Sequence, residues 1–160
     1  MSDYYKLRER LGEDYTIVLV GVPQSLKESL PKGIIGLLRT DSIDELSLLY
    51  STASIVMNLA SAESFGKTTP EGLACGTPSI VYNCTASPDL VDEKTGIVVE
   101  KGDIDALEKA VYTITNWNRE EAINNCRERA CNHYSTKSNW PKYIELYKDI
   151  IRKYYPNEKV

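Results

Sequence analysis

Histidine is nearly absent from this sequence, and its scarcity limits the catalytic chemistry that the chain can support. The only histidine among the 160 residues is His133. Because it lies far along the chain, mechanisms built on Ser-His-Asp or Cys-His pairs have little support. The four cysteines, Cys75, Cys84, Cys126 and Cys131, form no C-x-x-C pair. We therefore expect reduced structural thiols and no metal site.

Long apolar runs and the common nucleotide-binding motifs are missing as well. No apolar run approaches the length of a membrane span, and the N-terminus does not resemble a signal peptide, so we expect a soluble, cytoplasmic protein. Neither G-x-G-x-x-G nor G-x4-G-K-[ST] occurs, which removes the motifs of the usual dinucleotide-binding and P-loop proteins. The net charge of −4 argues against a nucleic-acid partner.

The chain has the composition of an ordinary globular domain. Hydrophobic residues make up 42% and charged residues 26% of the sequence. A chain of 160 residues is long enough for one domain with a substantial core. We expect one domain over residues 1–160, with a core over 1–134 and a C-terminal helix in 135–160.

Apolar runs of strand length alternate with helical patterns along the chain. The runs predict strands at 15–21, 33–38, 54–60, 79–82 and 94–100. Helices are expected at 4–11, 25–30, 103–117, 119–134 and 139–155, with shorter ones after Ser42, after Lys67 and at Ser87. This alternation predicts an α/β fold built on a parallel sheet.

Cap residues and apolar stripes define several of these helices. Ser42 and Glu45 have the spacing of a capping box, and Ser87 before Pro88 is expected to cap one helical turn. Pro141 is expected in the first turn of the last helix. Apolar faces are expected on three helices, at Ile43, Leu46, Leu49 and Tyr50, at Ile104, Leu107, Val111 and Ile114, and at Tyr143, Ile144, Tyr147, Ile150, Ile151 and Tyr154.

The most informative stretch runs from Ala62 to Pro78 and reads A-E-S-F-G-K-T-T-P-E-G-L-A-C-G-T-P. It lies between two predicted strands, so it forms a strand–loop–helix–strand unit of a parallel sheet. Glu63 and Glu71 have seven residues between them, and Glu63 follows the strand end at which ligands bind in such sheets. Gly66 allows the backbone to approach a ligand without a Cβ in the way.

The second half of this stretch is typical of a helix start. Thr68, Thr69 and Pro70 suit a cap and a first turn, so the N–H groups from Lys67 to Thr69 would be free to hold a phosphate or another anion. Each feature also has a purely structural interpretation, because Glu71 in a first turn complements the helix dipole and Gly-Thr-Pro ends a helix. Together, the features fit carboxylates for sugar and ribose hydroxyls and amides for phosphate.

The stretch from Glu63 to Glu71, with the Phe-Gly pair and the trailing Ala-Cys-Gly-Thr-Pro, resembles the E-x7-E signature of retaining, family-4-type glycosyltransferases. The order of elements from about Tyr15 to Ala110 is similar too. The resemblance implies a Rossmann-like, doubly wound, three-layer parallel sheet with C-terminal helices. This is the C-terminal half of a GT-B fold, the half that binds the nucleotide-sugar donor.

The resemblance also implies roles for single residues. Glu63 would contact the donor sugar and stabilise its positive ring during catalysis, and Glu71 would accept hydrogen bonds from the ribose hydroxyls. Donor sugar and diphosphate would be held by Ser64, Phe65, Gly66, Lys67 and Thr68. The base would lie near Arg39 and Thr40, although a solvated surface position is the alternative for Arg39.

Partners and cofactors follow from the same resemblance. The donor would be a nucleoside-diphosphate sugar, no metal would be required, and the acceptor, in surface polysaccharide or glycoconjugate assembly, could be associated with the inner membrane. The N-terminal acceptor-binding domain, on which 135–160 would pack, and the first strand of the donor domain have no counterpart in this sequence. We therefore expect this chain alone to be inactive. It also departs from the family at Thr85, Ala86, Ser87 and Asp89, so no ligand role is carried onto them.

Two other functions fit the same pattern. A GT-B-type sugar-nucleotide epimerase would share the architecture but would need a further acid and a histidine near the sugar, for which His133 is poorly placed. A non-catalytic nucleotide-binding or interaction domain is the other alternative. A phospho-receiver domain is disfavoured, because the run from Ser54 to Ala60 contains no aspartate.

Overall fold

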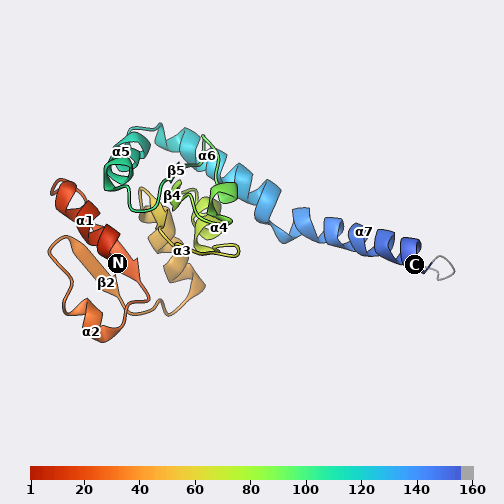
Figure 1. The fold of residues 1–160 in the computed structure, drawn as a ribbon, viewed down its shortest axis with the longest axis horizontal. Helices are drawn as coiled ribbons and strands as arrows, with labels where there is room; N and C mark the ends of the chain where they lie inside the picture. The colour runs from red at the N-terminus through yellow and green to blue at the C-terminus, as the bar shows by residue number, and fades with distance from the viewer. Residues whose placement is uncertain (156–160) are drawn as a thin grey trace.

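The computed structural model describes residues 1–155 and has the α/β architecture that the sequence predicted (Figure 1). All five predicted strands are present, as β1 (Ile17–Val20), β2 (Ile34–Leu37), β3 (Val56–Asn58), β4 (Ser79–Tyr82) and β5 (Gly96–Val99). The α-helices are α1 (Ser2–Arg10), α2 (Gln24–Lys27), α3 (Ile43–Thr52), α4 (Thr68–Ala74), α5 (Ile104–Thr115), α6 (Arg119–Arg129) and α7 (Thr136–Tyr154). A 3-10 turn, η1 (Ser87–Leu90), and a π-helical turn, η2 (Ala130–Tyr134), complete the elements.

The strands are parallel, as expected, but they form two sheets rather than one continuous doubly wound sheet. β1 pairs with β2, with Ile17 opposite Ile34. β3, β4 and β5 form the second sheet in that order, with Val56 opposite Ser79 and Ser79 opposite Gly96. The carboxyl ends of β3 and β4 therefore lie next to each other, and the loops that leave them start side by side.

The division leaves one edge of β3 without a strand partner among residues 1–155. The Val56 N–H donates to the Pro78 carbonyl on the β4 side at 2.9 Å, so the backbone of Met57 points to the opposite edge. There the hydroxyl of Tyr4, from α1, donates to the Met57 carbonyl at 3.4 Å. Burial raises the pKa of Tyr4, which keeps it a donor at neutral pH. A side chain thus takes the place of a ladder partner.

One hydrophobic core connects the two sheets. Ile17 and Ile34 of the first sheet belong to the same buried cluster as Ile80, Tyr82 and Val99 of the second. Side-chain packing, rather than a shared hydrogen-bond ladder, holds the sheets together in the part of the chain that the structure describes.

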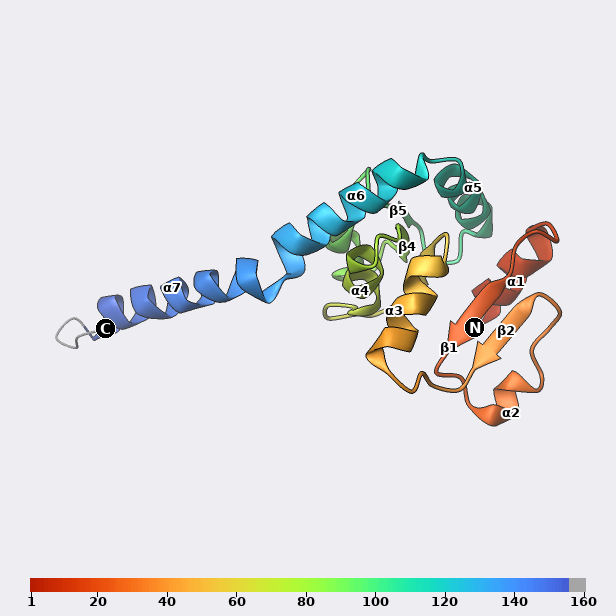
Figure 2. The ribbon, with the colours of Figure 1, turned by 180° about the vertical axis from the view of Figure 1, so that it is seen from behind.

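Helices α1 and α5 pack against each other at this core, as both views show (Figure 2). Arg10 of α1 forms ion pairs with Asp105 and Glu108 of α5. The predicted apolar face of α5 is confirmed, because all four of its members are buried: Ile104, Leu107, Val111 and Ile114.

The start of α3 is partly as predicted. Ser42 accepts a hydrogen bond from the Glu45 N–H at 3.1 Å, as a capping box requires. The Glu45 carboxylate, however, accepts from the N–H of Asp41 at 2.7 Å, one residue before the cap. Ile43 was expected on the apolar face but is 82% exposed, since it opens the helix ahead of the segment that packs.

Two other helix starts differ from the prediction. Ser87 does not cap η1, because Ala86 occupies the cap position without a side-chain hydrogen bond and Ser87 itself is buried. Pro141 lies inside α7 rather than in its first turn. That helix begins earlier, at Thr136, because the Ser135 hydroxyl caps it.

Helix α7 extends away from the rest of the molecule (Figure 1), and its apolar stripe is exposed. No residue of α7 is buried, and Tyr143, Tyr147 and Tyr154 are each at least 60% exposed. Within residues 1–155, no helix has both the length and the hydrophobicity of a membrane span. The division of the chain into a core over 1–134 and a segment over 135–160 stays a prediction, and 156–160 lie outside the described residues.

Candidate functional site

The loop between β3 and α4 carries both candidate carboxylates. It leaves the carboxyl end of β3 at Asn58 and enters α4 at Thr68. Glu63 lies in the loop and is half-buried, whereas Glu71 lies in the first turn of α4 and is exposed. The predicted strand–loop–helix–strand unit is therefore confirmed, with one carboxylate inside the strand-end loop and the other in the first turn of the helix that follows it.

Gly66 forms the floor under the Glu63 carboxyl group. Its φ of +70° is in the left-handed region that favours glycine. A Cβ placed on Gly66 would lie 2.8 Å from Asn58 Nδ2, 3.4 Å from Leu90 Cδ1 and 3.6 Å from Glu63 Cδ. Glycine is thus required here both by conformation and by the close approach of the Asn58 amide.

Asn58 joins the beginning and the end of the loop. It is 8% exposed at the end of β3. Its Oδ1 accepts from the Ala60 N–H at 3.3 Å, and its Nδ2 approaches Thr69 Oγ1 at 3.5 Å, the outer limit of a hydrogen bond. A buried amide placed in this way limits how far the loop can move relative to α4.

Thr85 holds the backbone of Glu63 from the neighbouring loop. The Glu63 N–H donates to Thr85 Oγ1 at 2.9 Å, and the same hydroxyl donates to the Glu63 carbonyl at 2.8 Å. Thr85 follows β4, so these bonds join the loops at the carboxyl ends of β3 and β4. Thr85 has a φ of 49°, which is unusual for a β-branched residue.

Tyr50 of α3 holds the second carboxylate. Its hydroxyl donates to Glu71 Oε2 at 3.1 Å. Burial and the adjacent Glu71 carboxylate raise the pKa of Tyr50 to about 12, so the phenol remains a donor at neutral pH. The Tyr50 carbonyl in turn accepts from Thr77 Oγ1 at 2.6 Å, which connects α3 to the segment after α4.

The start of α4 differs from the predicted open anion site. Lys67 is the cap residue and makes no side-chain cap hydrogen bond. The Thr69 N–H donates to the Gly66 carbonyl at 3.1 Å and is not free, and Pro70, the third helical residue, has no N–H. Ser64, Lys67 and Thr68 are exposed. The predicted set of three free amides was therefore wrong for Thr69.

Phe65 connects the loop to the π-helical turn η2. Its ring packs edge-on against Tyr134, with ring centroids 5.9 Å apart. Tyr134 donates its hydroxyl to the Leu90 carbonyl at 2.8 Å. Phe65 therefore rests on a residue that is itself held by the loop around η1, and π-helical turns of this kind occur often at functional sites.

Arg129 fixes the segment after η1. Its guanidinium donates to the carbonyls of Asp89, Leu90 and Val91 and forms an ion pair with Asp92 at 2.6 Å. Burial works against the charge of Asp92, but hydrogen bonds from Thr95 and from the Lys94 N–H, together with Arg129, lower its pKa below the usual value of 3.8. This network supports Leu90, which lies under Gly66.

Arg39 and Thr40 are not joined to the carboxylate loop. They follow β2, in the other sheet, and no hydrogen bond or ion pair links them to Glu63 or Glu71 within residues 1–155. Arg39 is exposed and Thr40 is half-buried. Their assignment to the base stays a prediction.

The described part of the chain contains no cluster of metal-ligating side chains. Among residues 1–155, no group of three or more His, Cys, Asp or Glu side chains is arranged to hold an ion. His133 is exposed in η2, with its ring 6.1 Å from that of Tyr134. The four cysteines are free thiols, and burial raises the pKa of Cys126 to about 12.

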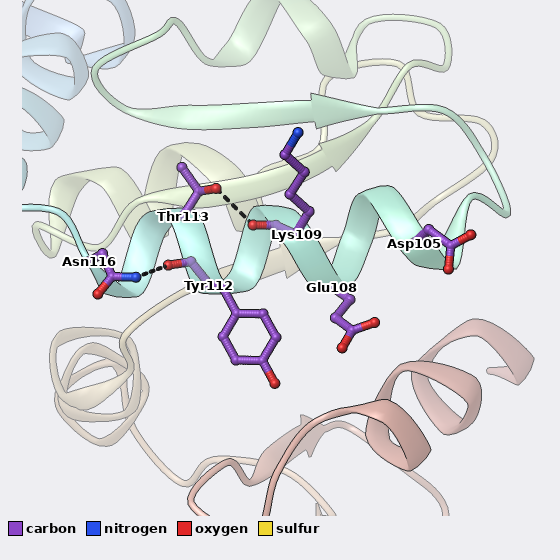
Figure 3. Close-up of a pocket in the computed structure, with 6 residues that line it drawn as sticks. All are labelled: Asp105, Glu108, Lys109, Tyr112, Thr113 and Asn116. Carbon is purple, nitrogen blue, oxygen red and sulfur yellow. Dashed lines mark hydrogen bonds between the residues drawn. The ribbon is translucent and has the colours of Figure 1, made fainter.

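A surface hollow of about 410 Å³ lies along α5, apart from the carboxylate loop (Figure 3). Its lining comes from one helix: Asp105, Glu108, Lys109, Tyr112, Thr113 and Asn116. The Thr113 hydroxyl and the Asn116 amide each donate to carbonyls of α5 at 2.8 Å. The Tyr112 ring packs edge-on against Tyr15 with centroids 5.6 Å apart. These groups stabilise the helix and its contacts, and we assign them no ligand.

Four residues that hold the site were missed from the sequence: Asn58, Thr85, Tyr50 and Tyr134. Only Asn58 had a usable signal, as a polar residue inside an apolar strand run. Tyr50 was assigned to an apolar face, although its hydroxyl reaches Glu71.

Comparison with known proteins identifies the family. The model of the family described as glycosyl transferases group 1 matches residues 2–116. The capsular polysaccharide biosynthesis glycosyltransferase CapM of Staphylococcus aureus is 27% identical over an alignment 189 positions long, which covers 93% of this chain and 49% of that protein. The chain therefore spans about half the length of that relative.

Solved structures agree with this assignment at the level of the fold. The crystal structure of TarM superposes with a TM-score of 0.71 at 16% identity, over 91% of this chain and 31% of that one. The sucrose-phosphate synthase of Thermosynechococcus elongatus gives 0.69 at 20% identity, over 96% of this chain and 49% of that one. The fold is thus the GT-B type of these glycosyltransferases. Since the family model covers most of its length, this chain belongs to the glycosyl transferases group 1 family.

Proposed function

We propose that this chain is the donor-binding domain of a retaining, family-4-type glycosyltransferase. In this proposal the segment from Glu63 to Glu71 is the E-x7-E motif, and its ligand is a nucleoside-diphosphate sugar. The observation that carries the proposal is the placement of the two carboxylates. Glu63 lies in the loop after β3, where Thr85 holds its backbone, and Glu71 lies in the first turn of α4, where Tyr50 holds its carboxylate.

The two carboxylates have separate tasks in this proposal. Glu63 lies over Gly66 and faces the donor sugar, where its charge stabilises the positive character that develops on the ring. Glu71, with Oε2 fixed by Tyr50, accepts hydrogen bonds from the ribose hydroxyls. Ser64, Phe65, Gly66, Lys67 and Thr68 lie between them in the chain and would contact the sugar and diphosphate.

The reaction breaks the bond between the anomeric carbon and the diphosphate and forms a bond to the acceptor oxygen on the same face of the sugar. The leaving phosphate takes the acceptor proton, so the chain needs no dedicated general base and no metal ion. Positioning and electrostatic stabilisation then supply the rate enhancement. A half-buried carboxylate such as Glu63 suits that role, because its field is less screened than at a fully exposed position.

The acceptor is assigned to protein outside this chain. The chain spans about half of its capsular polysaccharide relative, which leaves room for an acceptor-binding domain in a longer protein. The similarity to a capsular polysaccharide biosynthesis glycosyltransferase supports a role in surface polysaccharide assembly. In this proposal the donor-binding domain alone binds donor without transferring sugar.

The proposal is tested by titrating the chain with UDP-glucose, GDP-mannose and ADP-glucose and following backbone amide NMR signals. Saturable shifts from Gly66 to Glu71 with one nucleotide sugar are expected. Glu71→Gln should weaken that binding by about tenfold, the cost of one or two hydrogen bonds to a charged group.

The matched control is Glu120→Gln, which removes another exposed glutamate from the first turn of a helix. It should leave the affinity unchanged. The proposal fails if none of the three nucleotide sugars shifts these signals at millimolar concentration, or if both variants weaken binding equally.

A further inference from the structure

Thr85 has a backbone conformation that its side chain disfavours. Its φ of 49° makes it the one non-glycine residue with positive φ among residues 1–155. A β-branched residue meets steric conflict there, and such residues persist only where their surroundings enforce the conformation. Strained residues of this kind often occur at ligand sites.

The Thr85 hydroxyl makes two hydrogen bonds, and both go to the backbone of Glu63. It accepts from the N–H at 2.9 Å and donates to the carbonyl at 2.8 Å, across 22 residues of sequence. Because the N–H and the carbonyl belong to the peptide units on either side of the Cα, one hydroxyl fixes both. The direction in which the Glu63 side chain leaves the backbone is thereby set.

The Glu63 carboxyl group lies close to Gly66. Its carboxyl carbon would be 3.6 Å from a Cβ on Gly66, and Asn58 Nδ2 borders the same space. The carboxylate is therefore directed over the loop floor only while the backbone of Glu63 holds its orientation. Without the Thr85 hydroxyl, no other side chain among residues 1–155 hydrogen-bonds the Glu63 backbone.

We propose that Thr85 is a positioning residue that acts on the donor sugar through Glu63, by holding both of its backbone groups. This inference rests on the proposed function, in which Glu63 faces the sugar. It adds a residue from the loop after β4 to a site otherwise built from the loop after β3. Thr85 itself need not touch the ligand.

The test separates the sugar from the nucleotide part of binding. The chain is titrated with UDP, GDP and ADP and with UDP-glucose, GDP-mannose and ADP-glucose. For the base that binds, the ratio of the dissociation constants of the diphosphate and of its sugar conjugate reports the sugar's contribution. Thr85→Val keeps the shape but removes the hydroxyl, and should lower that ratio by about tenfold while the diphosphate binds as before.

Two further variants keep the test independent of folding. Thr85→Gly removes the hydroxyl at a backbone conformation that glycine accepts, and should lose the same contribution. Thr85→Ser retains the hydroxyl and should keep the wild-type ratio. Melting temperatures of all variants show that each is folded.

The outcomes distinguish this inference from the proposed function. A wild-type chain that binds neither diphosphates nor sugar conjugates overturns both. If the wild-type chain binds and the ratio of dissociation constants is unchanged in Thr85→Val and Thr85→Gly, only the role of Thr85 is overturned. A ratio that falls in Thr85→Ser as well would show that the methyl group or the backbone, not the hydroxyl, is responsible. That result would also overturn the role of the Thr85 hydroxyl.

Discussion

The hydroxyl of Tyr50 donates to Oε2 of Glu71 at 3.1 Å, from the last part of α3 to the first turn of α4. The bond orients a carboxylate that is otherwise exposed. It also assigns one carboxylate oxygen to the protein and leaves the other for a ligand. An exposed glutamate fixed in this way loses less side-chain freedom when it binds, because part of that cost is met in the free protein.

Tyr50→Phe should therefore weaken nucleotide-sugar binding by roughly threefold to tenfold, the effect of about one ordinary hydrogen bond, because the lost bond orients Glu71 and does not itself contact the ligand. Melting temperature should change little, since the ring still packs. Isothermal titration measures the affinity. Tyr143→Phe, at a tyrosine 60% exposed on α7, is the control and should have no effect. Equal affinities for wild type and Tyr50→Phe would show that Glu71 needs no orientation.

Glu63→Gln and Glu71→Gln should affect different parts of the donor. Glu63→Gln should preserve affinity for the free nucleoside diphosphate and reduce the additional affinity from the sugar, whereas Glu71→Gln should weaken both ligands alike. In a longer protein that transfers sugar, Glu63→Gln should lower kcat by about 100-fold, the usual effect of removing one electrostatic stabiliser of a transition state. Identical profiles for the two variants would contradict the separate roles.

Gly66→Ala should lower the free energy of unfolding by more than the positive φ of residue 66 alone explains. Gly66 and Gly102 both have positive φ, but a Cβ meets Asn58 Nδ2 at 2.8 Å at Gly66 and nothing within 4 Å at Gly102. We expect losses in the free energy of unfolding of ~2–3 kcal/mol for Gly66→Ala and ~1 kcal/mol for Gly102→Ala. Urea denaturation measures the free energy of unfolding of both variants. Equal losses would argue that the close approach of Asn58 to Gly66 does not matter for stability.

The ion pair of Asp92 with Arg129 should make the free energy of unfolding depend on pH in the acid range. The pKa of Asp92 is lower in the folded chain than its usual value of 3.8. The stabilisation that the charged Asp92 gives the folded chain is therefore fully present at pH values well above 3.8. It is lost as the pH falls through the lower, folded pKa. Asp92→Asn should reduce stability at pH 7 by about 1 kcal/mol and have less effect at acid pH.

Thermal melts of wild type and Asp92→Asn between pH 2 and pH 7 check this prediction. The pKa of Asp3, which accepts a hydrogen bond from Tyr82, is lowered too, so wild type loses further stability in acid. Asp3 is present in both proteins, and the difference between them isolates Asp92. A difference that does not shrink below pH 4 would contradict the prediction.

The sequence was sufficient to locate the strands and to place both candidate carboxylates between β3 and the end of α4, because these features are local. Apolar runs marked the strands, and Glu63 and Glu71 stand in one continuous motif. The contacts that orient them are not local: Thr85 is 22 residues from Glu63, and Tyr50 is 21 residues from Glu71. A threonine at positive φ has no signal in a single sequence. The start of α7 was predicted too late, from the position of Pro141, because the Ser135 hydroxyl caps the helix earlier.

The open edge of β3, capped only by the Tyr4 hydroxyl, also bears on how the molecule opens. No backbone ladder crosses from the β1–β2 pair to β3–β5 in the described chain, so either unit can separate without breaking a strand pairing of the other. Only the shared hydrophobic core opposes that separation, and native-state hydrogen exchange measures whether the two units open independently. The unit containing β3 and β4 keeps the loops of Glu63 and Thr85 together, so it could retain the carboxylate site while the other unit fluctuates.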